Sequence, residues 1–363
     1  MRILVVNAGS SSMKLRVLES DDTVAASRDL PAPRGLADEP ALDSAIKELG
    51  AVDAVGHRIV HGGTEFAAPV LIDASVRERL SALSDLAPLH QPKSLAALDA
   101  VSHVLPGVPA VGCFDTAFHA SIPPAAATYA LPPEWRKRWD LRRYGFHGLS
   151  HAFVSRRAAE LVGRPPEALR TVTCHLGAGA SLAAVQGGRS VDTTMGFTPL
   201  EGLVMATRSG SVDPGLVLWL EEHVGMPQGE LASALEHRSG LLGLSGTGDM
   251  VKLLAAVKAG DGGARLALDV YIHRLRGSIA AMAAAMGGLD VLVFTGGVGE
   301  NSSEIREAAT AGLGFLGVAV DGQQPSPKPD CEISRPGAAV RTLVIRARED
   351  LEIASEVRAL LAG

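Results

Sequence analysis

The 363-residue sequence has few cysteines, few aromatic residues and no large excess of charge of either sign. Cys113, Cys174 and Cys331 are too few and too irregularly spaced for a disulfide framework, so we expect a reducing, cytoplasmic environment. The net charge is −6 and the basic residues are scattered, which argues against a nucleic-acid partner. The chain enters an apolar strand at once, without the charged and apolar regions of a secretion signal.

The sequence also lacks a long apolar run. The most apolar helical segment, at 279–286, is short and follows Arg274 and Arg276, so we expect no membrane span and no membrane partner. Hydrophobic residues nevertheless make up 47% of the chain, which is enough for the cores of one large domain or, as we expect, two.

The first twenty residues predict a β-hairpin with a turn of small polar residues. Strands are expected at 3–6 and 13–18, the turn between them runs from Asn7 to Ser12, and Lys14 lies on the returning strand. Two interpretations stay open: a nest of donors for a phosphoryl group or its metal, or an ordinary turn. It is not a Walker loop, because the G-x-x-x-x-G-K-[ST] spacing is absent.

A second glycine-rich hairpin resembles the first. Strands predicted at 171–175 and 181–185 flank the turn at 176–180, and strands and helices follow both hairpins. Such self-similarity predicts an internal duplication, with two related α/β domains facing one another across a cleft. Each domain would then contribute one hairpin that faces phosphate.

Polar residues stand in or just after two apolar strands. Arg58 lies within the strand predicted at 52–60, where it either faces solvent or binds an anion through its two-pronged guanidinium. Asp115 follows the strand predicted at 108–114, where α/β folds place ligands. The alternative, that Asp115 caps the next turn, remains open.

Two histidines open a helix that is predicted to run through Val162. The i, i+4 spacing of His147 and His151 suits two metal ligands, but Gly148 stands where a metalloprotease needs glutamate and no third ligand is evident. We therefore expect Ser150 to cap the helix, with His147 aimed at whatever binds at its N-terminus.

Two loops and one strand–turn–helix unit complete the set of candidates. His90 lies on a loop between prolines, and Arg208 lies on a long loop of small and hydroxyl residues where it would clamp a transferring phosphoryl group. Each is alternatively a surface residue. The strand at 290–294 leads into a Gly-Gly turn and a helix from Ser303, which brings backbone amides to a nucleotide, although G-x-G-x-x-G is not met.

Ten motifs, in order along nearly the whole chain, resemble those of the acetokinase family, which shares its fold with actin, sugar kinases and heat-shock ATPases. They are NAGSSSMK (7–14), GHRIVHGG (56–63), APLHQP (87–92), FDTAFH (114–119), RRYGFHGLSH (142–151), HLGAGASLAAV (175–185), VDTTMGFTPLEG (191–202), TRSG (207–210), SGLLGLSGTGDM (239–250) and FTGGVGENS (294–302). The resemblance implies an α/β fold of two duplicated actin-like (ribonuclease H-like) domains, with mixed five-stranded sheets flanked by helices and a cleft between them. One domain is expected at 1–145, with the helix at 350–363 packing back on it, and the nucleotide-binding one at 146–349.

The resemblance further implies reversible, Mg²⁺-dependent transfer of the ATP γ-phosphoryl group to acetate by a homodimer, with acetyl phosphate and ADP as products and Mn²⁺ as an alternative metal. The implied catalytic residues are Asp115, His147 and Arg208. The implied substrate-binding residues are Arg58, Val60, Leu89, His90 and Pro199. The implied metal ligands are Asn7 and Glu349. The implied nucleotide-binding residues are Lys14, His175, Leu176, Gly177, Ala178, Gly179, Asp249, Met250, Val251, Gly297, Val298, Gly299, Glu300 and Asn301.

Three positions depart from the family pattern. Ala178 stands where asparagine is usual, Val251 where arginine is usual and Ala206 where glycine is usual, and the chain is shorter than usual around 20–50. The first two fall in the expected nucleotide site, so we predict an active enzyme with a weaker or altered nucleotide preference.

Two alternative functions remain open. A propionate or butyrate kinase is one, because a single methylene in an apolar pocket discriminates by only about 1–3 kcal/mol. The other is a catalytically dead, nucleotide-binding actin-like protein. Arg58, His147, Arg208 and Glu349 are all retained. Their joint retention argues against the second alternative, since a binding module needs no groups that act on a transition state.

Overall fold

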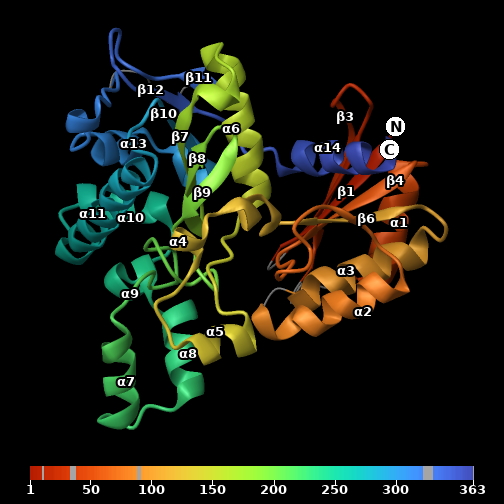
Figure 1. Ribbon diagram of the computed structural model, residues 1–363, viewed down its shortest axis with the longest axis horizontal. Coiled ribbons are helices and arrows are strands. Elements are labelled where there is room, and N and C mark those ends of the chain that lie inside the picture. The colour runs from red at the N-terminus through yellow and green to blue at the C-terminus, as the bar shows by residue number, and fades with distance from the viewer. Residues whose placement is uncertain (10–11, 33–37, 88–90, 322–329, 363) are drawn as a thin grey trace. The chain divides into compact units, whose positions relative to one another are not determined.

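The computed structural model describes residues 1–9, 12–32, 38–87, 91–321 and 330–362. Its contacts divide the chain into two compact units (Figure 1). Unit 1 comprises Met1–Ala120, Phe146–Phe153 and Arg348–Gly363, and unit 2 comprises Ser121–Gly145 and Val154–Ala347. The chain therefore passes between the units at several positions, and not once at 145 as expected, because residues 121–145 pack within unit 2.

Unit 1 is built on a six-stranded mixed sheet. Its strands are β1 (Ile3–Ala8), β2 (Ser12–Leu18), β3 (Val24–Pro31), β4 (Ala54–Ile59), β5 (Val70–Leu71) and β6 (Ala110–Phe114). They lie in the order β3-β2-β1-β4-β6-β5; β1, β4 and β6 run parallel and the other neighbours are antiparallel. The carboxyl ends of β1, β4 and β6 consequently share one edge, the place where open α/β sheets bind ligands.

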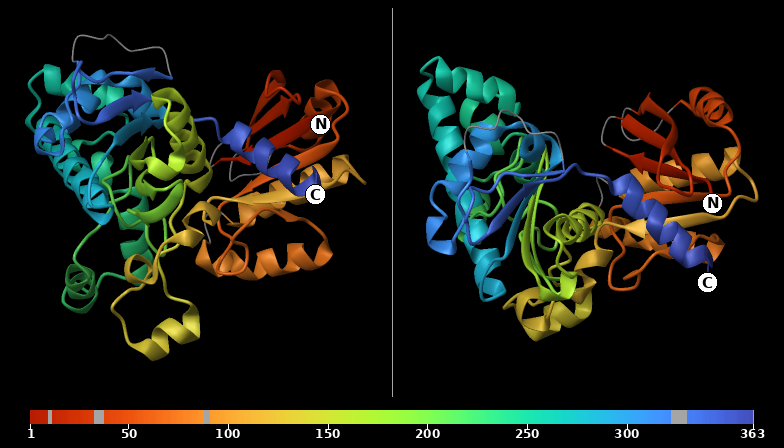
Figure 2. Two further views of the ribbon diagram at one scale, coloured as in Figure 1. Left: turned by 45° about the horizontal axis from the view of Figure 1, so that its top comes forward. Right: turned by 90° about the horizontal axis from the view of Figure 1, so that it is seen from above.

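Helices cover both faces of this sheet. They are α1 (Glu39–Leu49), α2 (Ala74–Ala82), η2 (Leu83–Leu86), α3 (Gln91–Val104), η3 (Ala117–Ser121) and α14 (Glu349–Ala362). Leu4 and Val6 of β1 pack toward α1 and α3, whereas Ile3 and Val5 pack toward α14, which follows from the alternation of side chains along a strand. Figure 2 shows α14 lying along the sheet. A Cβ on Gly56 would come within 2.5 Å of the Ile353 side chain, so this glycine lets α14 pack closely.

Unit 2 repeats the same topology with a second six-stranded sheet. Its strands are β7 (Arg170–Leu176), β8 (Ala180–Gln186), β9 (Arg189–Thr193), β10 (Val291–Thr295), β11 (Cys331–Glu332) and β12 (Arg341–Val344). The order β11-β12-β10-β7-β8-β9 gives every strand of unit 1 a counterpart of the same direction. The predicted duplication is confirmed. The expectation of five strands per sheet is wrong, because the two-residue edge strands β5 and β11 are too short to leave a sequence pattern.

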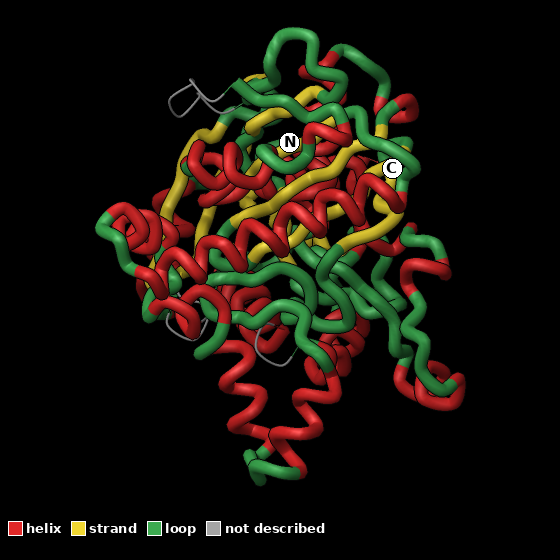
Figure 3. The backbone as a smooth tube through the Cα atoms, turned by 90° about the vertical axis from the view of Figure 1, so that its left-hand side faces the viewer, coloured by secondary structure: helices red, strands yellow, loops and turns green. Residues whose placement is uncertain are grey.

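Helices, red in Figure 3, flank the second sheet as well. The helical segments after residue 121 and before α14 are α4 (Pro124–Ala127), α5 (Pro133–Trp139), α6 (Gly148–Val162), η4 (Pro166–Ala168), α7 (Pro214–Glu222), α8 (Gln228–His237), α9 (Gly240–Ser245), α10 (Met250–Lys258), α11 (Gly262–Ala285), α12 (Gly296–Asn301), α13 (Ser303–Thr310) and η5 (Gly314–Leu316). Helix α6 begins at Gly148, so Ser150 lies within its first turn and the prediction that Ser150 caps it is wrong.

One stretch, Gly240–Lys258, passes a length-and-composition test for a membrane-spanning helix, with a mean hydropathy of 1.2 and 22% of it buried. In the structure this stretch forms two helices, α9 and α10, separated by left-handed Gly246 (φ 77°) and by Asp249, which caps α10. Neither helix approaches the roughly 20 residues that a span requires, so the stretch is weak support for one.

Candidate active site

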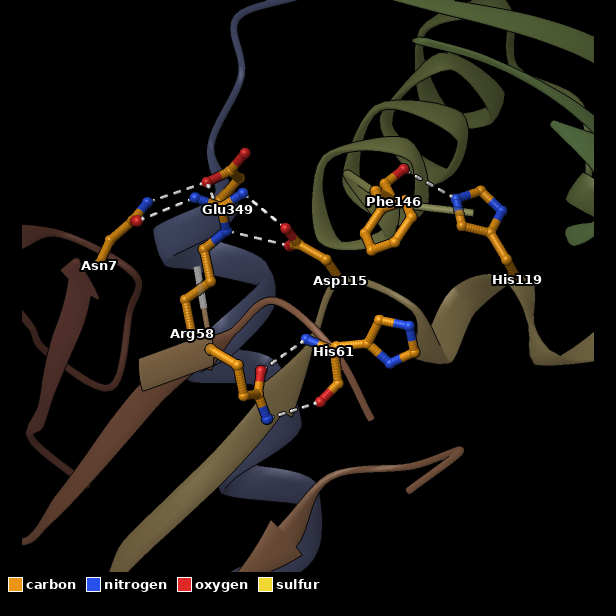
Figure 4. Close-up of polar contacts among 8 residues, drawn as sticks. Asn7, Arg58, His61, Asp115, His119, Phe146 and Glu349 are labelled. Atoms are coloured by element: carbon orange, nitrogen blue, oxygen red, sulfur yellow. Dashed lines mark hydrogen bonds and ion pairs between the residues drawn. The ribbon is translucent and has the colours of Figure 1, made fainter. Parts of the chain in front are cut away.

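Four polar side chains meet at the carboxyl edge of the unit 1 sheet (Figure 4). Asn7 comes from β1, Arg58 from β4, Asp115 from directly after β6 and Glu349 from the start of α14. Because the three strands are parallel neighbours, residues far apart in the sequence reach the same edge. The packing of α14 on these strands brings in the fourth residue.

Arg58 lies at the centre of this cluster. Its Nε and Nη2 donate to Asp115 Oδ1 at 3.0 Å and Oδ2 at 2.6 Å, and its Nη1 donates to Asn7 Oδ1 at 3.1 Å. Asn7 Nδ2 donates to Glu349 Oε2 at 2.9 Å, and Arg58 Nε lies 3.7 Å from the same oxygen. Among the described residues, three of the guanidinium's five N–H groups have a hydrogen-bond acceptor, which leaves two for a ligand.

The Arg58 side chain is only 17% exposed, so it does not face solvent. Burial opposes its charge, but the carboxylates of Asp115 and Glu349 raise the pKa of the guanidinium above its ordinary value. Burial raises the pKa of the Asp115 carboxyl, and the guanidinium of Arg58 opposes that shift. The Asp115 carboxylate is turned to Arg58, whereas its backbone carbonyl accepts from Gly148 N at 2.8 Å, at the start of α6.

Asn7 and Glu349 offer oxygen donors suited to a hard divalent cation. Within the described ranges no group of three His, Cys, Asp or Glu residues is arranged to hold a metal. One carboxylate and one amide would leave most coordination positions to water and phosphate oxygens, which is the pattern that Mg²⁺ prefers in nucleotide sites. The donor set therefore fits an ion that arrives with a nucleotide.

His147 stands beside this cluster with an unusual backbone. Its φ of 56° is left-handed, which costs a residue with a Cβ about 1–2 kcal/mol. The peptides on both sides are held: Gly148 N donates to Asp115 O at 2.8 Å, and His119 Nε2 lies 3.0 Å from Phe146 O (Figure 4). A Cβ on Gly148 would lie 2.2 Å from Asp115 O, so only glycine fits there.

Gln91 holds the loop that follows β4. Its Nε2 donates to His61 O at 3.0 Å and its Oε1 accepts from His61 N at 3.2 Å, while Gly62 N donates to Thr116 Oγ1 at 3.0 Å. Sequence reasoning missed Gln91, Thr116 and His119. All three lie inside motifs that carry the family resemblance, and membership of those motifs is the only sequence signal that they give.

In unit 2, Arg208 is a half-buried cation. Its Nη1 donates to Pro199 O at 3.3 Å and lies 3.9 Å from Met205 Sδ. Burial lowers the pKa of its guanidinium, and the charge of Glu236 opposes the shift. Across the part of the chain that the structure describes, no carboxylate lies within ion-pair distance of Arg208. Its positive charge is thus available to an anion.

The second hairpin lies at the carboxyl edge of the unit 2 sheet, as the first does in unit 1. Gly177 N donates to Gly179 O at 3.0 Å across the turn, and Ala178 O accepts from Ala206 N at 3.1 Å. His175, at the end of β7, is half-buried. The turn is thus tied to the loop that carries Arg208.

Helix α12 follows β10 at the same edge. Gly296 (φ 77°) packs closely on Leu176: a Cβ added to this glycine would lie 2.8 Å from the backbone oxygen of Leu176. Glu300 Oε1 accepts from Gly296 N at 3.0 Å and from Ala347 N at 2.9 Å, so this carboxylate serves the backbone. A Cβ on Gly297, by contrast, would meet nothing within 4 Å. The space above Gly297 is open.

The remaining expected nucleotide-site residues have local partners. Asp249 caps α10 by accepting from Val251 N at 2.8 Å, and Asn301 Nδ2 donates to Gly297 O at 2.9 Å. Val251 is 77% exposed, whereas Met250 is buried.

The other expected site residues are placed as follows. Leu89 and His90 lie outside the described residues. Val60 is buried in unit 1, and Pro199 belongs to unit 2. Lys14 is exposed on β2, directly opposite Asn7 in the hairpin.

The sequence profile of the acetokinase family matches residues 34–355. The chain belongs to the acetokinase family. It is 49% identical over 322 residues to the acetate kinase of Synechococcus sp. (strain JA-2-3B'a(2-13)), covering 88% of this chain and 79% of that relative. Among solved structures it is similar to Porphyromonas gingivalis acetate kinase, with a TM-score of 0.91, 36% identity and 99% of each chain covered. It is also similar to a propionate kinase from Francisella tularensis, with a TM-score of 0.90, 34% identity and 98% of each chain covered.

Family membership decides between the classes of function left open by the sequence. The chain has the fold of solved acetokinase structures over its whole length, and it is an enzyme of a kinase family. A nucleotide-binding protein without activity is accordingly set aside.

Proposed function

We propose that this chain catalyses the reversible transfer of the γ-phosphoryl group of ATP to acetate, giving acetyl phosphate and ADP by direct in-line transfer. The observation that carries the proposal is Arg58, a charged side chain with two N–H donors to spare, held between Asp115 and Glu349 at a ligand-binding edge of an acetokinase-family chain. A guanidinium with two parallel donors matches a carboxylate bidentately.

The proposed reaction needs little acid–base catalysis. A carboxylate oxygen of acetate attacks the γ-phosphorus, the bond from that phosphorus to the bridging β-phosphate oxygen breaks, and ADP leaves with the electron pair. No proton has to move in this step. Catalysis then rests on positioning and on neutralising charge, so Asp115 serves by fixing the orientation of Arg58.

His147 and Arg208 are proposed to stabilise the equatorial oxygens of the transferring group. Supporting this role, Arg208 lacks a carboxylate partner in the described residues, and His147 is held in a left-handed backbone beside Asp115. An arginine in this role is worth roughly 10³-fold or more in rate.

The nucleotide is proposed to bind to unit 2, through the backbone of the 176–180 hairpin and of α12. The open space at Gly297 and the backbone amides near it support this assignment. Ala178 and Val251 lack the side-chain donors usual in the family, so we expect a raised KM for ATP, or a preference for GTP, relative to ordinary acetate kinases. KM values for both nucleotides that match those enzymes would contradict this.

Acetokinases use ATP and generally a divalent metal, which we propose to be Mg²⁺ here, with Mn²⁺ as an alternative. Asn7 and Glu349 would hold it. When bound, the ion supplies positive charge to the phosphate oxygens.

We further propose that the chain works in the cytoplasm as a homodimer, without nucleic-acid or membrane partners. Leu216, Leu218 and Trp219 on α7 expose large apolar side chains, which supports contact with a second copy. Figures 1 and 3 show α7 and α8 extending from the rest of unit 2.

A propionate kinase is the second candidate, because a solved propionate kinase is as similar in structure as the acetate kinases. A hydroxamate assay with ATP, Mg²⁺ and acetate, propionate or butyrate as separate acceptors decides between them. We expect acetate to have the highest kcat/KM. A ranking led by propionate would change the substrate, and no acyl phosphate from any acid would overturn the proposed function.

A further inference from the structure

We propose that His119 is a positioning residue, which holds His147 in its left-handed conformation through the backbone carbonyl of Phe146. The inference rests on the proposed role of His147 in phosphoryl transfer. It concerns a buried residue four positions beyond Asp115.

The ring of His119 is held in one orientation. The residue is fully buried in η3, and its Nε2 lies 3.0 Å from Phe146 O (Figure 4). Since a carbonyl oxygen can only accept, Nε2 carries the proton. The ring makes edge-on contacts with the rings of Phe118 and His151, whose centroids each lie 5.6 Å from its own. The donor is therefore aimed at Phe146 O by packing as well as by the hydrogen bond.

Hydrogen bonds on either side of His147 act on its two backbone torsions. Phe146 O belongs to the peptide plane that precedes the His147 Cα and sets φ, and Gly148 N belongs to the plane that follows and sets ψ. His119 holds the first plane. The second is held at Gly148 N by the carbonyl of Asp115 and at His147 O by the backbone N–H of His151, which donates at 3.0 Å. Without the first bond, the plane that sets φ loses this restraint, and His147 shifts toward the right-handed region that residues with a Cβ favour.

His119 and the carbonyl of Asp115 come from one short segment, 115–119, which also presents the Asp115 carboxylate to Arg58. The same segment thus orients the Asp115 carboxylate, which binds Arg58, and holds the peptides on either side of His147. Burial lowers the pKa of His119 to about 4, so its ring is a neutral donor at neutral pH and adds no charge near a phosphoryl group.

The test is a double-mutant cycle. His119→Leu, which removes the donor, and His119→Gln, which keeps an N–H at the same reach, are made in the wild type and in His147→Ala. We expect H119L to lower kcat roughly 10- to 100-fold with both KM values changed less than about threefold, and H119Q to keep most of the activity. In the His147→Ala background, H119L should lower kcat by less than about twofold further, although the loss in Tm should be the same in both backgrounds.

Val101→Ala, in the α3 core away from His119, is the control: it should lower Tm without changing kcat in either background. An H119L effect on kcat of equal size in both backgrounds would overturn the inference. A fully active His147→Ala enzyme would instead refute the proposed role of His147. If H119L does not fold, H119Q and H119N decide, because the amide of asparagine is one bond too short; equal activity of the two would also overturn the inference.

Discussion

At the scale of single residues, the charges around Arg58 do not balance. One guanidinium and two carboxylates leave a net −1, and the proposed substrates, acetate and ATP, are also anions. The site consequently needs further positive charge when it is filled. The oxygen donors of Asn7 and Glu349 suit a divalent cation, which would supply such charge.

Replacing Arg58 with glutamine should leave two carboxylates facing each other without their cation. We expect a loss of about 3 kcal/mol in the free energy of unfolding, because an unpaired charge then stays buried. Without Arg58 the pKa of Asp115, already raised by burial, rises further. A carboxyl that binds its proton more tightly when folded stabilises the fold at low pH and loses that contribution as pH rises through its folded pKa.

The loss in free energy of unfolding that Arg58→Gln causes relative to wild type should therefore be smaller at pH 5 than at pH 8. Urea unfolding at both pH values measures it, and a deficit that does not change with pH would contradict the argument. The same variant should lose activity with acetate at either pH.

Arg208→Ala should cut kcat about 10³-fold or more while leaving the KM for ATP nearly unchanged. The fold should not lose stability, because burial lowers the pKa of this guanidinium, which means that the folded state holds its charge at a cost. Steady-state kinetics and Tm measure both effects. Arg238→Ala, an exposed arginine at the end of α8, is the matched control and should change neither. An unchanged kcat for Arg208→Ala would refute the proposed role.

At the scale of elements, the two sheets use the same edge with different chemistry. The two sheets can be aligned at the last residue pair before the turn of each hairpin. The strand registers then give Asn7, Arg58 and Asp115 one counterpart each in unit 2. The counterparts are His175, Thr295 and Ala347. None of them is a carboxylate or a guanidinium, and the nearby Glu300 carboxylate accepts backbone N–H groups instead. At these three positions the second edge thus lacks the paired charges of the first.

Gly297→Ala tests the nucleotide assignment of this edge. The added methyl group meets no atom of the protein within 4 Å, so the free energy of unfolding should stay the same or rise slightly. If the nucleotide lies against Gly297, the KM for ATP should rise roughly tenfold or more while the KM for acetate does not change. Gly277→Ala in α11, also in open space, is the control and should leave both KM values unchanged. An unaltered KM for ATP in Gly297→Ala would move the nucleotide elsewhere.

The elements that sequence reasoning found are those with a strong apolar pattern. Both hairpins, the end of helix α6 at Val162 and the start of helix α13 at Ser303 were predicted within a few residues. Strand β3 was missed, because most of its residues are exposed and show no alternation. The candidate site divides in the same way: Arg58 and Asp115 were identified from their strands, but their pairing with each other depends on tertiary contacts that no local pattern records.

At the scale of the whole molecule, buried histidines set the response to acid. Burial lowers the pKa values of His57, His61 and His119 in unit 1 to about 4. The unfolded chain binds these protons near pH 6.5, so the histidines' contribution to stability is complete above about pH 6.5 and is lost as pH falls toward 4. At about pH 4, each of these histidines can lower the free energy of unfolding by up to roughly 3 kcal/mol.

The free energy of unfolding should accordingly fall steeply between pH 6.5 and 4. Urea unfolding across this range gives the slope, and His57→Phe, which cannot take up a proton, should reduce it by about one proton. His103→Gln, at an exposed position of α3, should leave the slope unchanged. A free energy of unfolding that stays constant from pH 6.5 to 4 would contradict the assignment of these three rings as neutral and buried.

Helix α14 has a further consequence for how the protein is made. Its residues Ile353, Ala354 and Val357 cover a face of the first sheet formed by Ile3 and Val5, and its first residue is Glu349. On the ribosome, the strands of unit 1 emerge before unit 2 and this helix emerges after it, roughly 10–50 s later at about 5–20 residues per second. During that interval the nascent sheet has an uncovered apolar face that invites aggregation or chaperone binding. A chain that stops before α14 therefore lacks part of the core of unit 1 and is not expected to fold as a smaller enzyme.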